Sequence, residues 1–195
     1  MTARPECGSV VYRVAVSVIG VLVRPRSTFA GLAESPRIAL GFLAVLGSGL
    51  AALLLGLLAN MIDGGGSAGA FASLVLPLLF LMYWAAAALI VDAGAGLTGR
   101  AGRWRQYLGV SGFTLVPWIA YGVLSVIEAL AGSGSVAQSV VEWLTLPLLV
   151  WFLSLTTLAV QAVYDVTPYV AVALALLPDA ALLFVLIALL VATNL

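Results

Sequence analysis

IALGFLAVLGSGLAALLLGLLANMI, residues 38–62, is a stretch without a single charged side chain. An α-helix rises 1.5 Å per residue, so about 20 apolar residues cross a bilayer core about 30 Å thick. The stretch is therefore long enough to span a membrane as one helix. Of the 195 residues in the chain, 64% are hydrophobic and 8% are charged, whereas a soluble domain carries about 25% charged residues. We expect an integral membrane protein.

Four further apolar stretches follow the first one, and each is again long enough to span a bilayer. They cover approximately residues 71–91, 107–131, 139–163 and 168–194. Such unbroken runs are far too long for the strands of a membrane barrel. The sequence predicts an all-α integral membrane bundle of five transmembrane helices over residues 38–195, preceded by a cytoplasmic N-terminal segment, residues 1–37.

The eight basic residues are all arginines, and every one lies on the same predicted side of the membrane. Five precede the first span and three lie between the second and third: Arg4, Arg13, Arg24, Arg26, Arg37, Arg100, Arg103 and Arg105. The loops at 63–70 and 132–138 contain none. Because arginine-rich loops stay in the cytoplasm, we expect the N-terminus on the cytoplasmic side of the cell membrane and the C-terminus on the outer side.

The N-terminal segment contains an apolar stretch, residues 10–23, that is too short to span the bilayer. Its polar positions fall on one helical stripe: Arg13, Ser17, Gly20 and Arg24. This pattern predicts an amphipathic helix that lies in the cytoplasmic interface. Residues 14–18 also alternate like a strand, but no partner strand is available, so we prefer the helix.

Three short sequence patterns predict where helices begin. Ser27 is a candidate N-cap of a second short helix. The pairs Ser35-Pro36 and Thr167-Pro168 each resemble an N-cap followed by proline at the first helical position. They predict where the first and last spans begin.

Small residues recur every four positions along the first span: Ala44, Ser48, Ala52 and Gly56. Small side chains at this spacing let two membrane helices approach closely. We prefer packing against a neighbouring helix of the same chain. A homodimer seam is the alternative.

Each of the four later spans contains one proline: Pro77, Pro117, Pro147 and Pro178. Proline kinks a helix, and paired broken helices form the binding sites of some transporters. Proline is nevertheless common in membrane helices, and the chain has no inverted repeat that pairs the breaks. We therefore interpret the prolines as ordinary kinks.

Asp179 is the acidic residue that does not lie at the end of a span. If the last helix is continuous from Pro168, Asp179 lies near mid-membrane, where a charge costs about 2.5–3.5 kcal/mol. It would then be protonated or paired with a buried polar group such as Gln161 or Asn60. We prefer this continuous, kinked helix. In the alternative, the helix breaks at residues 177–179.

The sequence lacks most of the residue types from which enzyme active sites are built. The chain has no histidine and no lysine, and its single cysteine, Cys7, permits no internal disulfide or zinc cluster. The sequence at 109–112 matches the GxSG of rhomboid proteases, which need a histidine. Tyr164-Asp165 matches the YD of intramembrane aspartyl proteases, but Asp179 lacks their GxGD context. We expect no catalytic residue, metal or cofactor, and the net charge of zero gives no reason to expect nucleic acid.

The loop between the second and third spans mixes positive charge with an interfacial aromatic ring: Arg100, Arg103, Trp104 and Arg105. An arginine near an anionic leaflet gains about 1 kcal/mol. We expect this loop to contact lipid headgroups.

Two motifs give the chain a family resemblance. Pro25-x-x-x-Phe29-x-x-Leu32-x-x-x-Pro36 lies just before the first span, and Gly112-Phe113-Thr114-Leu115-Val116-Pro117 lies in the third. With five spans and a short loop containing glycine and arginine, the chain resembles the Yip-one domain family of Ypt/Rab-interacting membrane proteins over residues 10–195.

The resemblance implies a protein without catalytic residues. Eukaryotic members are implicated in Rab GTPase recruitment through a cytosolic N-terminal region, but only residues 1–9 precede the interfacial helix here, so we expect no Rab partner. The all-arginine, alanine-rich usage indicates a prokaryotic-type member. Our leading hypothesis is a non-enzymatic interaction or membrane-organising component, with the lipid bilayer, other membrane proteins or a second copy as partners. The alternative is a small transporter or channel subunit that uses its proline kinks and Asp179.

Overall fold

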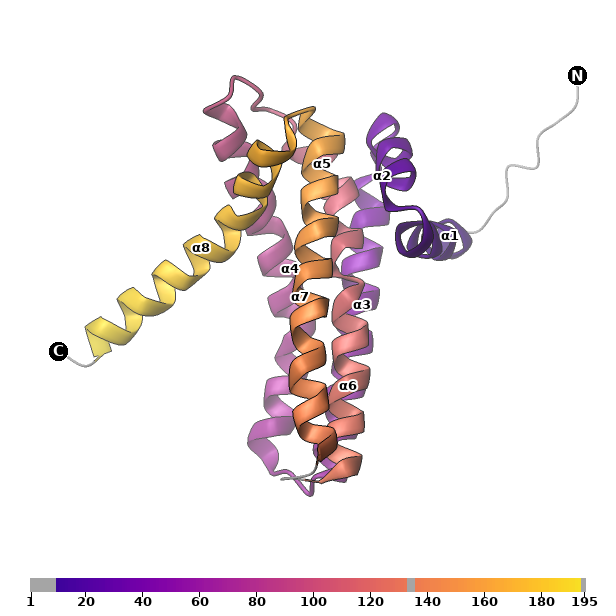
Figure 1. Cartoon of the computed structure of the whole chain (residues 1–195), viewed down its shortest axis with the longest axis vertical. Helices are drawn as coiled ribbons and strands as arrows, with labels where there is room; N and C mark the ends of the chain where they lie inside the picture. Colours follow the sequence, from indigo (N-terminus) through magenta and orange to yellow (C-terminus); the bar gives the residue numbers. More distant parts are fainter. Residues whose placement is uncertain (1–9, 133–135, 194–195) are drawn as a thin grey trace, which may run out of the picture.

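The computed structural model describes residues 10–132 and 136–193, so Arg4 and Cys7 lie outside the described part. The described residues form helices and no strand (Figure 1). The elements in chain order are α1 Val10–Val23, α2 Pro25–Glu34, α3 Ile38–Ile62, α4 Ser67–Gly96, α5 Trp104–Ser111, the 3₁₀ helix η1 Gly112–Leu115, α6 Pro117–Ala131, α7 Val136–Tyr164 and α8 Pro168–Thr193.

Five helical segments of the described chain are long and apolar enough to cross a membrane. They are α3, α4, the combined α5–η1–α6 segment, α7 and α8, and the short apolar helix α1 comes before them. The predicted fold class, an all-α bundle of five membrane helices after a short N-terminal helix, is confirmed.

The third span is interrupted, although the sequence predicts one helix over 107–131. α5 ends at Ser111, the 3₁₀ turn follows, and Pro117 then begins α6. Pro117 has no N–H and cannot donate to the carbonyl four residues earlier. The Phe113 carbonyl instead accepts from the N–H of Val116, three residues later, at 3.5 Å. The proline thus starts a helix where the sequence predicts a kink within one.

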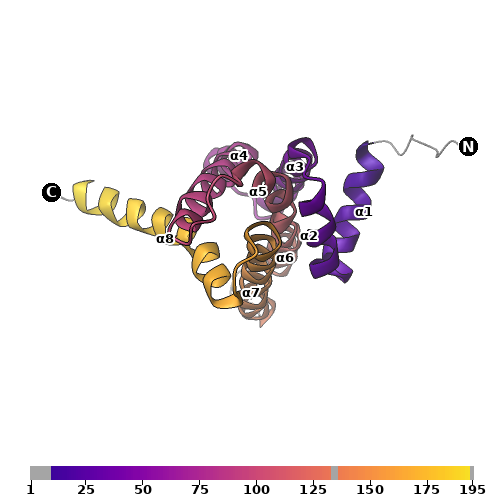
Figure 2. The ribbon, with the colours of Figure 1, turned by 90° about the horizontal axis from the view of Figure 1, so that it is seen from above.

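The first half of this broken span forms the centre of the bundle. Every residue from Tyr107 to Pro117 is buried. Helices α3, α4 and α7 contact α5, helix α6 contacts η1, and the view along the bundle shows α5 beside α3 and α4 (Figure 2). This part of the core is therefore a segment without charged side chains, and it follows directly on the arginine-rich loop.

Glycines permit the backbone of α5 and η1 to touch the backbone of α3. A Cβ on Gly112 would lie 2.7 Å from the Cα of Gly41, and a Cβ on Gly109 would lie 3.1 Å from the backbone N of Arg37. A Cβ on Gly41 would in turn collide with the Leu108 carbonyl oxygen. The glycines of the protease-like GxSG sequence thus serve helix packing.

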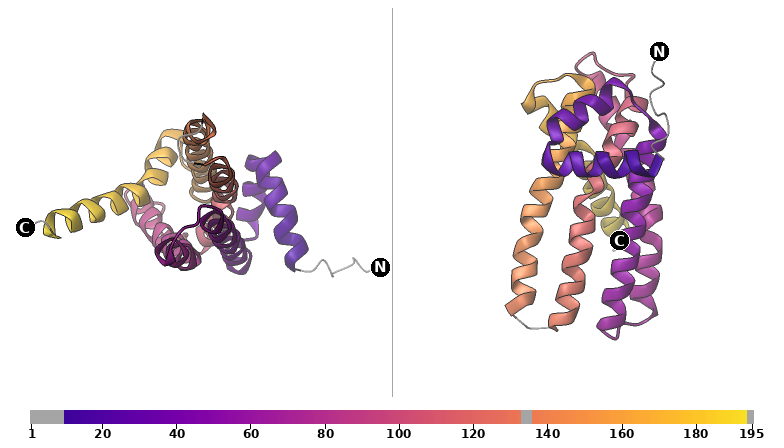
Figure 3. Two further views of the ribbon diagram at one scale, coloured as in Figure 1. Left: turned by 90° about the horizontal axis from the view of Figure 1, so that it is seen from below. Right: turned by 90° about the vertical axis from the view of Figure 1, so that its right-hand side faces the viewer.

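The two N-terminal helices lie against the side of the bundle, with α1 crossing it (Figure 3). Val21 of α1 is fully buried, and Gly20 faces α2, because a Cβ there would meet Thr28 Oγ1 at 2.7 Å. Part of the predicted polar stripe therefore faces protein, while Ile19 and Val23 are exposed. The interfacial location of α1 stays a prediction.

Two of the predicted helix starts are wrong and one is confirmed. The N-cap of α2 is Arg24, and Ser27 donates its hydroxyl to the Arg24 carbonyl from inside the helix at 3.2 Å. α3 begins after Arg37, two residues later than predicted from Pro36. The last span does begin at Pro168.

Both boundaries of α4 also differ from prediction. The helix begins at Ser67, ahead of the apolar run that starts at residue 71. It also continues through Asp92 to Gly96, although the apolar run ends at Val91. The carboxylate of Asp92 accepts hydrogen bonds from the chain that follows, as described below.

The last helix leaves the bundle halfway along its length (Figure 1). It is continuous through Pro178, as the preferred interpretation predicts. Ala171, Leu174 and Ala175 are buried, but the large apolar side chains from Leu182 to Val191 are 49% to 73% exposed. α8 is thus half packed and half free of the rest of the chain.

Candidate functional site

The carboxyl group of Asp179 lies inside the membrane-spanning part of the bundle and is half-buried. Its partner is Tyr83 of α4, whose hydroxyl donates to Asp179 Oδ1 at 2.8 Å. This bond joins α8 to α4 just where α8 begins to diverge. A hydrogen-bonded partner lowers the cost of placing a polar group in hydrocarbon.

Gln161 and Asn60, the candidate partners of Asp179 in the sequence, lie elsewhere in the bundle. Gln161 is near the end of α7, in a groove with Arg26. Asn60 is near the other end of the bundle, close to the glycine turn after α3: a Cβ on Gly65 would lie 2.9 Å from the Asn60 Cγ. The sequence could not indicate Tyr83, because nothing in an apolar run marks which of its tyrosines faces another helix.

A lateral cavity of about 570 Å³ opens beside this pair, between α4, α6, α7 and α8. Its walls are mainly large apolar side chains, among them Phe80, Trp118 and Phe152. Asp179 and Tyr83 supply most of its polar groups among the described residues. The cavity therefore suits an apolar group, with one carboxyl at its edge.

A second polar cluster lies at the arginine end, the end of the bundle that carries α2 and the loops at 97–103 and 165–167. Asp92 Oδ1 accepts hydrogen bonds from the backbone N–H of Arg103 at 2.8 Å and the hydroxyl of Tyr164 at 3.0 Å. Asp92 Oδ2 accepts from the backbone N–H of Gly102 at 3.0 Å. One carboxylate of α4 thus fixes both the start of α5 and the end of α7.

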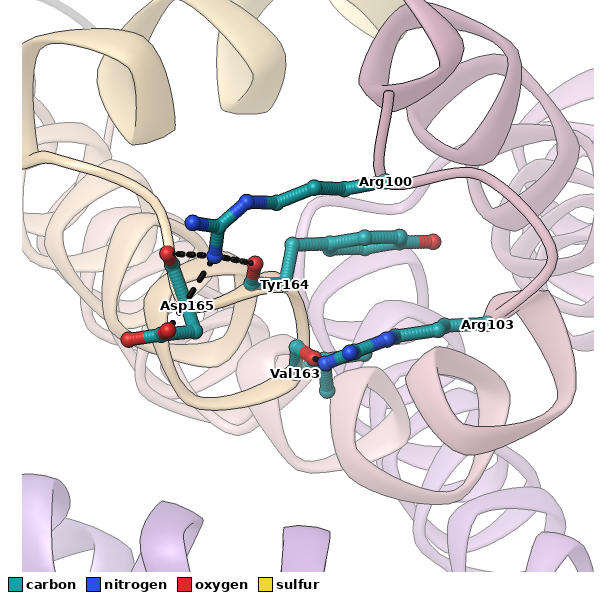
Figure 4. A network of polar contacts seen from close by, with 5 residues as sticks. All are labelled: Arg100, Arg103, Val163, Tyr164 and Asp165. Atoms are coloured by element: carbon teal, nitrogen blue, oxygen red, sulfur yellow. Dashed lines mark hydrogen bonds and ion pairs between the residues drawn. The ribbon is translucent and has the colours of Figure 1, made fainter. Parts of the chain in front are cut away.

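The two arginines of the same loop bind the last carbonyls of α7 (Figure 4). Arg103 Nη1 donates to the Val163 carbonyl at 2.7 Å, and Arg100 Nη1 donates to the Tyr164 carbonyl at 2.7 Å. Arg100 also donates to the Asp165 carbonyl and forms an ion pair with its carboxylate at 3.1 Å. The last carbonyls of a helix lack partners inside it, and these guanidinium groups supply them.

The residues predicted to contact lipid headgroups therefore divide into two pairs. Arg100 and Arg103 direct their guanidinium groups to α7. Arg105 stacks over the ring of Trp104, 5.2 Å from its centroid, and is exposed. Lipid contact stays a prediction for Trp104 and Arg105, whereas the other pair has an internal structural role that the charge pattern alone could not indicate.

The motif residues before the first span attach α2 to the bundle. Pro25 begins α2, Phe29 is fully buried, and Leu32 is half-buried. Gln106 of α5 donates to the Ala33 carbonyl at 2.7 Å. The remaining two motif prolines are Pro36, exposed in the α2–α3 connection, and Pro117, buried at the start of α6.

The stripe of small residues on α3 lies inside the bundle. Ala44, Ser48 and Ala52 are buried, and a Cβ on Gly56 would meet Ser73 Oγ of α4 at 2.9 Å. The chain itself covers this stripe. Among the described residues no three metal-ligating side chains come together.

These features define a multi-pass α-helical membrane protein with a broken, glycine-packed third span and an N-terminal helix pair docked at its arginine end. The family model for the Yip1 domain matches residues 19–190, nearly the whole chain, and the chain belongs to this family of non-enzymatic membrane proteins. Comparison with curated proteins and with solved structures finds no match.

Proposed function

We propose that the protein is a non-enzymatic component of the cell membrane that acts by lateral association with other membrane proteins or with a second copy of itself. The observation that carries the proposal is the divergence of α8. From Leu182 onward this helix exposes apolar side chains around its circumference, and it leaves the cavity beside Tyr83 uncovered. A span that extends away from its own bundle offers surface to another transmembrane segment.

The energetics of membrane helices favour such an association. Lipid removes the hydrophobic drive between helices, so that association depends on van der Waals packing and interhelical hydrogen bonds. A partner helix beside α8 would fill the cavity of about 570 Å³ and gain packing that acyl chains give less completely. The Asp179 carboxyl at the edge of this cavity adds a directional hydrogen bond.

The proposed orientation places the arginine end in the cytoplasm. The described arginines Arg13, Arg24, Arg26 and Arg37 belong to α1, α2 and their connections, Arg100 and Arg103 belong to the loop bound to α7, and Arg105 lies in the first turn of α5. This common end supports an inside N-terminus by the positive-inside rule.

Site-specific photocrosslinking tests lateral association directly. A benzophenone amino acid replaces Phe184 of α8 in one variant and Phe71 of α4 in a matched control, since both side chains are exposed. In native membranes we expect discrete protein adducts from position 184 and lipid adducts from position 71. Two differently tagged copies in one cell distinguish a second copy from another protein. Lipid adducts alone at both positions would overturn the proposal.

The Asp179 cavity also favours a second function, that of a small transporter or channel subunit. Helices α4, α7 and α8 each contain an internal proline, and three of the cavity walls belong to them. This function predicts that Asp179→Asn abolishes an ion- or proton-coupled flux in proteoliposomes, while Asp63→Asn in the exposed α3–α4 turn does not. Absence of flux from the wild-type protein would count against it.

A further inference from the structure

We infer that a groove at the arginine end binds one anionic glycerophospholipid through its phosphate and ester groups. This inner groove, about 390 Å³, lies between α2, α7 and α8. The residues that the inference uses are Arg26, Val150, Leu153, Thr157 and Gln161. None of them belongs to the Asp179 cavity except Leu153, so the inference stands apart from the proposed lateral association.

The polar part of the groove is rich in hydrogen-bond donors. Arg26 offers a guanidinium group, Gln161 an amide N–H₂ and Thr157 a hydroxyl. No aspartate or glutamate is among the described residues that line it. Donors without a competing carboxylate suit a ligand that consists of acceptors and carries negative charge, and a phosphodiester with two carboxylic esters is such a ligand.

These donors have no partner within the described chain. Hydroxyls elsewhere in the helices bond back to the carbonyl four residues earlier, as Thr145, Ser154 and Thr156 do. The Thr157 hydroxyl makes no such bond to the backbone. In the part of the chain that the structure describes, the side chains of Gln161 and Arg26 also make no hydrogen bond. A polar group at membrane depth without a partner costs free energy, so an external acceptor stabilises it.

The order of the groups along α7 matches the order of groups in a phospholipid. Gln161 lies less than one turn before the end of α7 at Tyr164, and Thr157 lies one turn, about 6 Å, deeper. Arg26 of α2 lies at the same end of the bundle. The phosphate then meets Arg26, the esters meet Gln161 and Thr157, and the acyl chains run along Leu153 and Val150.

Arg26 is the one described arginine that lines the groove, and three others at this end are engaged elsewhere. Arg100 and Arg103 already bind the carbonyls of α7, and Arg105 stacks on Trp104. Arg26 is exposed and lines the groove without an ion pair among the described residues. An arginine beside an anionic headgroup contributes about 1 kcal/mol, which corresponds to about a fivefold preference over a zwitterionic lipid.

Native mass spectrometry of the full-length protein from detergent tests the inference. Phosphatidylglycerol and phosphatidylcholine with identical acyl chains are added in equal amounts. We expect one retained phosphatidylglycerol per chain with about fivefold preference. Arg26→Gln should remove the preference, and Thr157→Val or Gln161→Met should lower the retention of both lipids. The matched controls Arg37→Gln, an exposed arginine at the same end outside the groove, and Thr145→Val should behave as wild type.

Each contrary result overturns a defined part of the inference. Equal retention of the two lipids by the wild type refutes an anionic site, and an equal loss in Arg37→Gln assigns the preference to diffuse surface charge. Wild-type retention by both Thr157→Val and Gln161→Met refutes the ester contacts. Displacement of the lipid by inorganic phosphate would identify a free anion as the ligand instead. Size-exclusion chromatography confirms that each variant remains monodisperse before it is compared.

Discussion

Replacement of Asp92 by alanine should destabilise the arginine end more than any other single change to a charged residue there. Its carboxylate accepts three hydrogen bonds, from the N–H groups of Gly102 and Arg103 and from the hydroxyl of Tyr164. The substitution removes all three. It leaves the start of α5 without its acceptor and the Tyr164 hydroxyl without a partner.

The magnitude follows from the number of bonds and the partial exposure of the group. A hydrogen bond contributes a net of about 0.5–1.5 kcal/mol, and bonds to charged groups contribute more. Because Asp92 is half-buried, solvent compensates part of this, and we take about 1 kcal/mol for each bond. Asp92→Ala should therefore cost about 3 kcal/mol, or about 6–12 °C in Tm for a chain of this size.

Thermal unfolding in detergent, followed by circular dichroism, measures this loss. Asp63→Ala is the matched control, since Asp63 is exposed in the turn after α3 and should change stability by less than about 0.5 kcal/mol. Tyr164→Phe should cost about 1 kcal/mol. The double variant Asp92→Ala/Tyr164→Phe should lose no further stability from the hydrogen bond between these two residues, because Asp92→Ala alone already removes it. A melting temperature of Asp92→Ala that equals that of the Asp63 control would refute the reasoning.

Three further substitutions test the packing. Gly112→Ala should cost about 1–3 kcal/mol in the same unfolding assay, because the new Cβ collides with the backbone of α3, whereas Gly47→Ala, which meets nothing within 4 Å, should be neutral or stabilising. Tyr83→Phe should cost about 1 kcal/mol through loss of the bond to its carboxyl partner, and the exposed Tyr121→Phe should cost less; equal losses would contradict a role for that bond. Phe29→Ala should cost about 3–5 kcal/mol and expose the connection around α2 to limited proteolysis; an unchanged cleavage pattern would show that α2 docks without this side chain.

The five membrane helices were predictable because a helix that crosses the bilayer needs about 20 consecutive apolar residues, and such runs are visible in the sequence. Their positions agree with the apolar runs to within a few residues, except where α4 continues past Asp92. An acidic residue ends an apolar run in the sequence, but it does not by itself end a helix. The donors of Asp92 belong to residues ten or more positions away, and the hydropathy pattern does not indicate such long-range hydrogen bonds.

The break in the third span and the partner of Asp179 were not predictable for a related reason. A single proline in an apolar run is compatible with a kinked helix or with two helices. Which one forms depends on the close contact of Gly112 with α3, a property of two distant segments. Likewise, Tyr83 is 96 residues away from Asp179 in sequence. Long-range polar pairs between apolar helices leave no periodic signal in either helix.

The proposed orientation of the chain places the inner groove in the cytoplasmic leaflet and the free half of α8 toward the outer one. Cys7 is the single cysteine of the chain, so a membrane-impermeant maleimide reports on the N-terminal side. A variant that combines Cys7→Ser with Thr193→Cys carries its one thiol at the end of α8 instead. Five crossings predict that intact cells label the variant at position 193, whereas Cys7 of the wild type reacts only once the membrane is opened. Labelling of Cys7 in intact cells, or of both positions from the same side, would contradict the account.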